Sequence, residues 1–181
     1  LANLKGEEQI LIYNNKGIEG HSLTKGTLLW SYEWTNVEST ICSQPVLVPG
    51  TDNQVLLSIG YSKGAVLLEV EGGADEEWSA KPVWTSKEMK TKFTTAVIHD
   101  GSIYGLDDGI LACVDLKTGK RKWKKGRYQH GQLLLVGEWL VIQAEEGDVV
   151  LVKPNPEKLE EVGRITALKG KTWNNPAINK E

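Results

Sequence analysis

The 181-residue sequence has little of what metal centres and disulfide scaffolds require. It contains two cysteines, Cys42 and Cys113, and three histidines. Two cysteines are too few for a disulfide framework, and their spacing with the histidines matches no zinc motif. We expect both cysteines to be buried as small apolar side chains. The sequence is also compatible with a single disulfide bond between them.

Long apolar runs and an excess of one charge are also missing. No run approaches the roughly 20 residues that span a bilayer, so no transmembrane segment is predicted. The net charge is −3, from 21 basic and 24 acidic residues, which gives no general attraction to nucleic acid or anionic lipid. The chain starts at Leu1 without a signal-peptide pattern and stops after a strand-like segment at 176–178. We therefore expect a piece cut from a longer protein.

The apolar residues that are present form short runs rather than a helical pattern. Runs such as 10–13, 55–59, 110–114 and 149–152 have strand length and are bounded by Gly, Asn and Asp. Asp108-Gly109 joins two of them and is typical of a tight hairpin. The sequence therefore predicts an all-β protein.

Four of the strands recur at regular distances. If Pro45, Ala96, Leu133 and Pro176 are equivalent, the steps are 51, 37 and 43 residues, near the 40–45 residues of a four-stranded propeller blade. A polar, acidic insertion at 71–80, expected to be a loop, explains the long step. We predict about four blades of four antiparallel strands, belonging to a seven- or eight-bladed ring. The predicted units are 1–38, 39–89, 90–128 and 129–170, with a fifth beginning at 171–181.

One segment carries a more specific signal. Cys113, Asp115, Thr118, Gly119 and Trp123 form a strand end, a turn and a second strand. A weaker copy lies at residues 20–30, where Trp30 follows Gly26 by the same four-residue step. A unit that recurs at blade distance is typical of a repeat architecture.

The Asp-x-x-Thr-Gly-x-x-x-Trp segment resembles the repeat of the pyrroloquinoline quinone (PQQ)-like β-propellers. That superfamily includes quinoprotein alcohol dehydrogenases, the propeller lipoprotein of the bacterial β-barrel assembly machinery and secreted propellers. The resemblance implies that each motif Trp docks on the neighbouring blade, over a small residue and the turn glycine. In the fourth unit we expect Ile165 at the Trp position. The expected docking residues are Gly26, Trp30, Trp84, Cys113, Asp115, Thr118, Gly119 and Trp123.

The remaining motifs offer little chemistry. The basic run at 117–127 is predicted to lie on an outer strand, where lysines prevent edge-to-edge pairing. Trp78 and Trp173 lie outside the motif and are candidates for ligand contact. Asp107-Asp108-Gly109 is interpreted as a turn, although its carboxylates and the amides of Asn174 and Asn175 are ligand types that Ca²⁺ accepts.

The resemblance implies that PQQ-binding members use an adjacent-cysteine disulfide, a stacking Trp, an Asp base and Ca²⁺ held by Glu and Asn. This sequence has no adjacent cysteines. We therefore expect no catalytic residue, no metal and no cofactor. The alternative is a fragment of a PQQ- and Ca²⁺-dependent dehydrogenase whose missing part supplies the site.

The favoured hypothesis is a non-catalytic binding or scaffold propeller, periplasmic or secreted. It would bind a protein partner or an extracellular ligand but no nucleic acid, and would self-associate through exposed blade edges if its ring is incomplete. Binding is expected on the hairpin turns and blade-to-blade connections of one face. The candidates are Asn14, Asn15, Ser62, Lys63, Asp107, Asp108, Tyr128, Glu145, Glu146 and Trp173.

Overall fold

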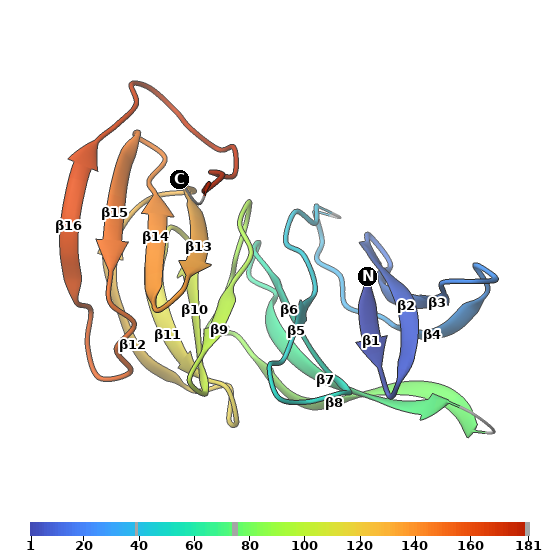
Figure 1. The fold of residues 1–181 in the computed structure, drawn as a ribbon. Coiled ribbons are helices and arrows are strands. Elements are labelled where there is room, and N and C mark those ends of the chain that lie inside the picture. The colour runs from blue at the N-terminus through green and yellow to red at the C-terminus, as the bar shows by residue number, and fades with distance from the viewer. Residues whose placement is uncertain (39, 74–75, 180–181) are drawn as a thin grey trace.

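The computed structural model describes residues 1–38, 40–73 and 76–179, and within these ranges it contains strands and no helix. The strands form four separate sheets of four antiparallel strands each, in chain order across every sheet. Figure 1 shows the sheets following one another along the molecule. The predicted all-β architecture of four-stranded blades is confirmed.

We number the sheets as blades 1 to 4. Blade 1 contains β1 (Ala2–Leu4), β2 (Glu7–Asn14), β3 (Gly17–Ser22) and β4 (Leu28–Tyr32). Blade 2 contains β5 (Val46–Leu47), β6 (Gln54–Ile59), β7 (Gly64–Gly73) and β8 (Glu76–Ser86). Blade 3 contains β9 (Val97–His99), β10 (Ser102–Asp107), β11 (Ile110–Asp115) and β12 (Arg121–Arg127). Blade 4 contains β13 (Gln132–Val136), β14 (Trp139–Gln143), β15 (Asp148–Val152) and β16 (Glu161–Thr166).

Each pair of neighbouring blades shares one apolar layer. Val55, Leu57 and Val66 of blade 2 pack with the first blade, and the opposite faces of β6 and β7 pack with blade 3. Tyr104 and Leu111 of blade 3 belong to the layer shared with blade 4. The central strands of blades 2 and 3 are consequently buried on both faces, as their continuous apolar runs require.

The acidic insertion is a strand hairpin, so the predicted loop at 71–80 is wrong over the described residues. β7 continues to Gly73 and β8 begins at Glu76, while 74–75 lie outside the described residues. Trp78 and Ala80 pack against the cluster that contains Ala2 and Leu4. Figure 1 shows this long hairpin running past β1 and β2. The apolar residues within the acidic segment explain why it is folded against blade 1.

The segment after β16 forms no strand in the described residues 167–179. The fifth unit predicted at 171–181 therefore contributes no sheet there, and 180–181 lie outside the described residues. Figure 1 shows the segment crossing from β16 towards β13.

The expected burial of the cysteines holds for Cys113 and fails for Cys42, which is exposed, and both thiols are free.

A one-residue bulge recurs in the outer strand of every blade. In blade 3, Cys113 faces Trp123 and Val114 faces Arg121, so Lys122 has no opposite residue on β11. The residue pairs that directly precede the bulge are Gly20 and Trp30, Leu67 and Trp84, Cys113 and Trp123, and Leu151 and Gly163. We call the outer-strand residue of each of these pairs the docking position. The bulge determines which residue occupies it.

In blade 4 this position belongs to Gly163, so the prediction of Ile165 is wrong. Ile165 faces Val149 two residues further along β16 and is 65% exposed. A Cβ added to Gly163 would have no heavy atom within 4 Å. Blade 4 therefore carries no indole at the position where blades 1 to 3 carry one.

Candidate functional site

Two tryptophans join neighbouring blades by the same hydrogen bond. The Trp84 indole Nε1 donates to the carbonyl of Leu116 at 2.9 Å, from blade 2 to blade 3. The Trp123 Nε1 donates to the carbonyl of Asn155 at 2.9 Å, from blade 3 to blade 4. Each large ring adds apolar contact to a directional bond. Trp84 and Trp123 therefore connect neighbouring blades, and we call each of these contacts a clasp.

The turn that receives Trp84 is built by the motif residues. The Asp115 carboxylate accepts the backbone N–H and the hydroxyl of Thr118, and these bonds hold the pKa of Asp115 below its ordinary value. Gly119 has a φ of +67° and donates its N–H to the Asp115 carbonyl. The left-handed glycine lets the indole of Trp84 lie directly on the turn.

Blade 1 repeats this turn without a docked ring. Gly26 has a φ of +68° and bonds the Ser22 carbonyl at 2.8 Å, as Gly119 bonds Asp115 at 2.9 Å. The hydrogen bond of Trp30 differs from the expected one, because its Nε1 donates to Gln9 Oε1 within blade 1 at 2.7 Å and not to the neighbouring blade. The ring itself still belongs to the layer between blades 1 and 2.

The pair of glycines provides a matched prediction. A Cβ on Gly119 would lie 2.7 Å from the Trp84 ring, whereas a Cβ on Gly26 has nothing within 4 Å. Both Ala variants carry the left-handed strain of about 1 kcal/mol. Gly119→Ala should lose a further ~1–3 kcal/mol through overpacking. Urea unfolding of the two variants measures the difference, and equal losses would mean that Trp84 does not rest on the turn.

The hairpin turns between second and third strands, and the connections that follow the outer strands, form what we call the loop face. Backbone hydrogen bonds tie its segments together across blades 3 and 4. Tyr128 N–H donates to the Gly109 carbonyl, Glu145 N–H to the Tyr128 carbonyl, and Thr172 N–H to the Glu145 carbonyl, at 2.8, 3.0 and 2.8 Å. Figure 1 shows the turn between β14 and β15 and the C-terminal segment at the same end of blade 4.

Asp107 was expected on the binding surface but lies in the interior. Its side chain is fully buried, with ion pairs to Lys90 Nζ at 2.6 Å and Lys124 Nζ at 2.5 Å. The Lys90 backbone N–H also donates to its Oδ1 at 3.0 Å. Arg121 lies 3.5 Å from Asp107 and pairs with Glu88. Sequence reasoning missed this network, and it explains part of the basic run on the outer strand β12.

Tyr128 was expected to be exposed and is buried, with 1% of its surface accessible. Its hydroxyl donates to Glu161 Oε2 at 3.0 Å. Burial and that carboxylate raise the pKa of Tyr128 above its ordinary value. The side chain fills the layer between blades 3 and 4, because its neighbour Gly126 leaves room for the ring. Tyr128 is therefore not available to a partner on the loop face.

Glu145 holds the loop face of blade 4 together. One of its oxygens accepts the His130 N–H at 2.8 Å, and the other lies 3.6 Å from Lys171 Nζ. The backbone bond from His130 is the main reason why the pKa of Glu145 lies below its ordinary value of 4.5. Its neighbour Glu146 is exposed and lines a hollow with Lys171.

The lowered pKa of Glu145 makes a prediction about pH. Because its carboxylate is stabilised in the folded state, its charge contributes stability above pH 4.5, and this contribution is lost as pH falls through the folded pKa. Glu145→Gln should therefore be less stable than the wild type near pH 6, with a gap that closes as the pH falls below 4.5. Urea midpoints across this range measure the gap, with the exposed Glu146→Gln as control. A constant gap would contradict the assignment.

Trp173 lies over the connection into blade 3. Its ring centroid is 5.0 Å from that of Phe93, and Lys171 Nζ lies 4.9 Å from the Trp173 ring. The buried Gln132 amide donates to the backbone carbonyls of both aromatic residues, at 2.8 and 2.7 Å. Trp173 remains 45% exposed. It is thus held in place with part of its surface accessible.

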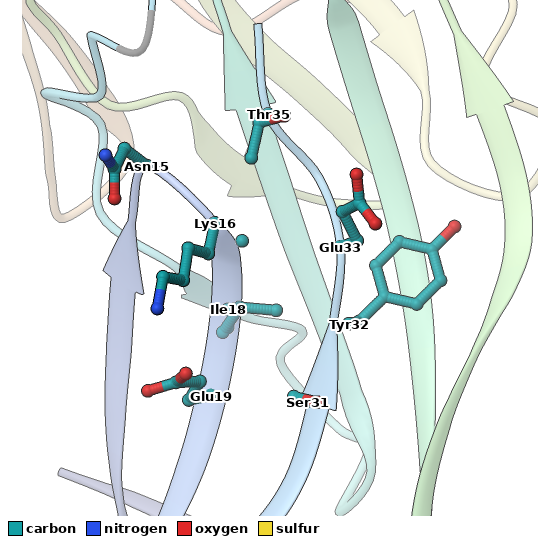
Figure 2. A pocket seen from close by; sticks show the side chains of 9 residues that line it. Asn15, Lys16, Ile18, Glu19, Ser31, Tyr32, Glu33 and Thr35 are labelled. Carbon is teal, nitrogen blue, oxygen red and sulfur yellow. The ribbon is translucent and has the colours of Figure 1, made fainter.

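Three of the other loop-face candidates line hollows, namely Asn15, Ser62 and Lys63. A hollow of about 460 Å³ lies beside the β2–β3 turn and includes Asn15, Lys16 and Glu19. Figure 2 shows Lys16 and Glu19 pointing to one side of the strands and Tyr32 to the other. Asn14 caps the turn, because its Oδ1 accepts the Lys16 N–H at 2.8 Å. Asp108 is partly exposed, with Lys90 Nζ at 3.7 Å.

Ser62 and Lys63 line a separate hollow of about 360 Å³ between blades 1 and 2. The Lys63 ammonium lies 4.1 Å from the ring centroid of Trp34, a residue that sequence reasoning did not connect with this face. Within the described ranges, no group of three or more His, Cys, Asp and Glu side chains could hold a metal ion. No helix in the described part of the chain is long and apolar enough to cross a membrane.

Comparison with known proteins fits this geometry. Residues 1–125 match the family model described as outer membrane protein assembly factor BamB. The chain belongs to this family of PQQ-like β-propellers. In a crystal structure of BamB from Moraxella catarrhalis, the likeness covers 94% of this chain and 64% of that chain, with a TM-score of 0.50 and 13% identity. At this identity the likeness shows the fold alone.

A second structural resemblance is to a putative 6-phosphogluconolactonase from Bacteroides fragilis. It has a TM-score of 0.58 and 13% identity over 85% of this chain and 50% of that chain. Two serine/threonine-protein kinases named AfsK also match, from Streptomyces griseus and Streptomyces coelicolor. Their identities are 34% over 68 residues and 30% over 73 residues, which are 34% and 36% of this chain. The matched segments are only 8% and 9% of the kinases' lengths.

Proposed function

We propose that this chain is a non-catalytic binding propeller that holds a protein partner on its loop face, outside the cytoplasm. The observation that carries the proposal is the use of the loop-face carboxylates. Asp107 pairs with two lysines, and Glu145 holds the His130 N–H and Lys171. Because these groups join blades and loops, they serve as structural supports for a presenting surface rather than as acids or bases.

The side chains present do not fit a PQQ and Ca²⁺ centre. Cys42 and Cys113 are far apart in the sequence and are free thiols, one exposed and one buried. Asp107 is one of the oxygen ligands that the sequence offers to Ca²⁺, but its carboxylate already faces the ammonium groups of Lys90 and Lys124. We therefore propose that the protein works without this cofactor.

Self-association through the outer blades is part of the same proposal. Every residue of β16 is exposed, including Ile165, and Leu28 of β4 is 55% exposed on blade 1. Apolar side chains on an unpaired outer strand favour contact with another strand edge. Sedimentation of the chain over a range of concentrations tests this point, and a monomer at every concentration would reject it.

Site-specific photo-crosslinking in the native cell envelope tests the partner. A crosslinker at Asn15 or Glu146, on the loop face, should capture a protein that one at Lys120, on the opposite turn, does not. Capture at none of the three positions, or equally at all of them, would reject the proposal. A saturable change in Trp fluorescence with PQQ and Ca²⁺, accompanied by dye reduction, would favour a dehydrogenase instead.

A further inference from the structure

One hollow on the loop face combines positive charge with hydrogen-bond donors. It is the 360 Å³ hollow between blades 1 and 2, bordered by the second residue after β4, by the β6–β7 turn and by the end of β8 with the residue after it. None of its lining residues is acidic. The lining residues are Trp34, Ser62, Lys63, Thr85, Ser86 and Lys87. Hollows of this size are typical of sites that take a small ligand or one side chain.

The two lysines have no carboxylate partner among the described residues. Lys63 rests over the Trp34 ring at 4.1 Å, and Lys87 is exposed. Two other lysines of the loop face differ, since Lys90 pairs with Asp107 at 2.6 Å and Lys171 lies 3.6 Å from Glu145. Two uncompensated cations at one concave site raise the local concentration of anions.

One residue that lines the hollow also carries a hydrogen-bond donor without an acceptor. Trp34 is 9% exposed, and its buried Nε1 makes no hydrogen bond in the described part of the chain. An indole nitrogen can only donate, and buried polar atoms are seldom left unpaired in folded proteins. Ser86 is already engaged, because its hydroxyl donates to the Gly119 carbonyl at 2.6 Å. The lining therefore combines two ammonium groups with an unpaired indole donor and contains no carboxylate.

We propose that this hollow binds a carboxylate side chain from an acidic peptide segment of the protein partner. The carboxylate would lie between the Lys63 and Lys87 ammonium groups, while the indole of Trp34 gives apolar contact to the methylene groups of the same side chain. A free inorganic anion uses only the charge and leaves most of the 360 Å³ unfilled. This inference rests on the proposed function, since it names the chemistry of the partner at the same face.

Peptide titration of the intact chain tests the site. The probes are acetyl-tetraglutamate amide, the matching tetraglutamine peptide and inorganic phosphate. In ¹H–¹⁵N spectra the indole resonance of Trp34, assigned with Trp34→Phe, should shift with tetraglutamate and not with tetraglutamine. The Lys63→Gln/Lys87→Gln double variant should weaken tetraglutamate binding by about tenfold or more. Lys171→Gln, at a lysine that already has a carboxylate neighbour, should change it by less than about twofold.

The outcomes separate this site from the proposed function. Equal binding of both peptides, no loss in the double variant, or a shift confined to Trp173 would overturn the site. Phosphate binding as tightly as tetraglutamate would overturn the peptide assignment. If crosslinking captures a partner that the double variant still holds, the site is wrong and the function stands. If tetraglutamate binds as expected but no partner is captured, the site stands and the function is wrong.

Discussion

Replacing Asp107 with Asn should destabilise the protein by about 3–5 kcal/mol, the loss expected when one partner of a buried ion pair is removed. The carboxylate is fully buried and faces the ammonium groups of Lys90 and Lys124. An amide has nearly the same shape, so the loss reports charge rather than volume. Urea unfolding followed by circular dichroism measures the free energy.

Two further variants show whether the effect comes from uncompensated charge. Asp108→Asn changes the adjacent carboxylate, which is 43% exposed and 3.7 Å from Lys90, and should cost less than about 1 kcal/mol. Adding Lys124→Met to Asp107→Asn should recover part of the loss, because one partly buried cation that has lost its carboxylate is then removed. Equal effects of Asp107→Asn and Asp108→Asn would show that the pairs at Asp107 contribute nothing particular.

Replacing Trp123 with Ala should cost about 3–5 kcal/mol, as for other large aromatic residues in a core. The ring is 8% exposed within the layer between blades 3 and 4, and its Nε1 bonds the Asn155 carbonyl at 2.9 Å. Trp123→Phe keeps most of the apolar contact but loses the N–H, so its loss should be nearer ~1 kcal/mol. Chemical denaturation with a circular dichroism signal measures both variants.

Trp139→Ala is the matched control, because the same residue type is removed from a position that is 40% exposed. Its loss should stay below about half of that of Trp123→Ala, since much less apolar area returns to water. Equal losses at the two positions would mean that general Trp content, rather than the clasp between blades, determines stability.

The strand pattern and the repeat were predictable because both depend on local sequence. Short apolar runs bounded by Gly and Asp predict strands, and the Asp115-to-Trp123 segment predicts a turn with its clasp. The ion pairs of Asp107 were not predictable, because Lys90 and Lys124 each lie 17 residues away along the chain and meet it only through the fold. Tyr128 follows a strand, so its sequence position suggested a surface loop although its ring turns inward.

The error at Ile165 has a similar physical origin. Blade 4 lacks the turn glycine from which the Trp position is counted, and a one-residue bulge cannot be located from apolar spacing alone. The pairing of Leu151 with Gly163 appears only once β15 and β16 are aligned in the sheet. Trp34 was missed for a related reason, since its contact with Lys63 joins two blades that are separate in the sequence.

The long β7–β8 hairpin couples the local unfolding of blade 1 to that of blade 2. Its base belongs to blade 2, whereas Trp78 and Ala80 towards its tip pack against the cluster that contains Trp30 of blade 1, and β8 lies beside β4. Detaching the first sheet must therefore uncover the distal half of the hairpin at the same time. Amide hydrogens of β4 and of the part of β8 that lies beside it should exchange with solvent as one cooperative group. No comparable hairpin joins blades 3 and 4 in the described residues. Their separation therefore depends on the apolar layer between them and on the hydrogen bond from Trp123 to Asn155.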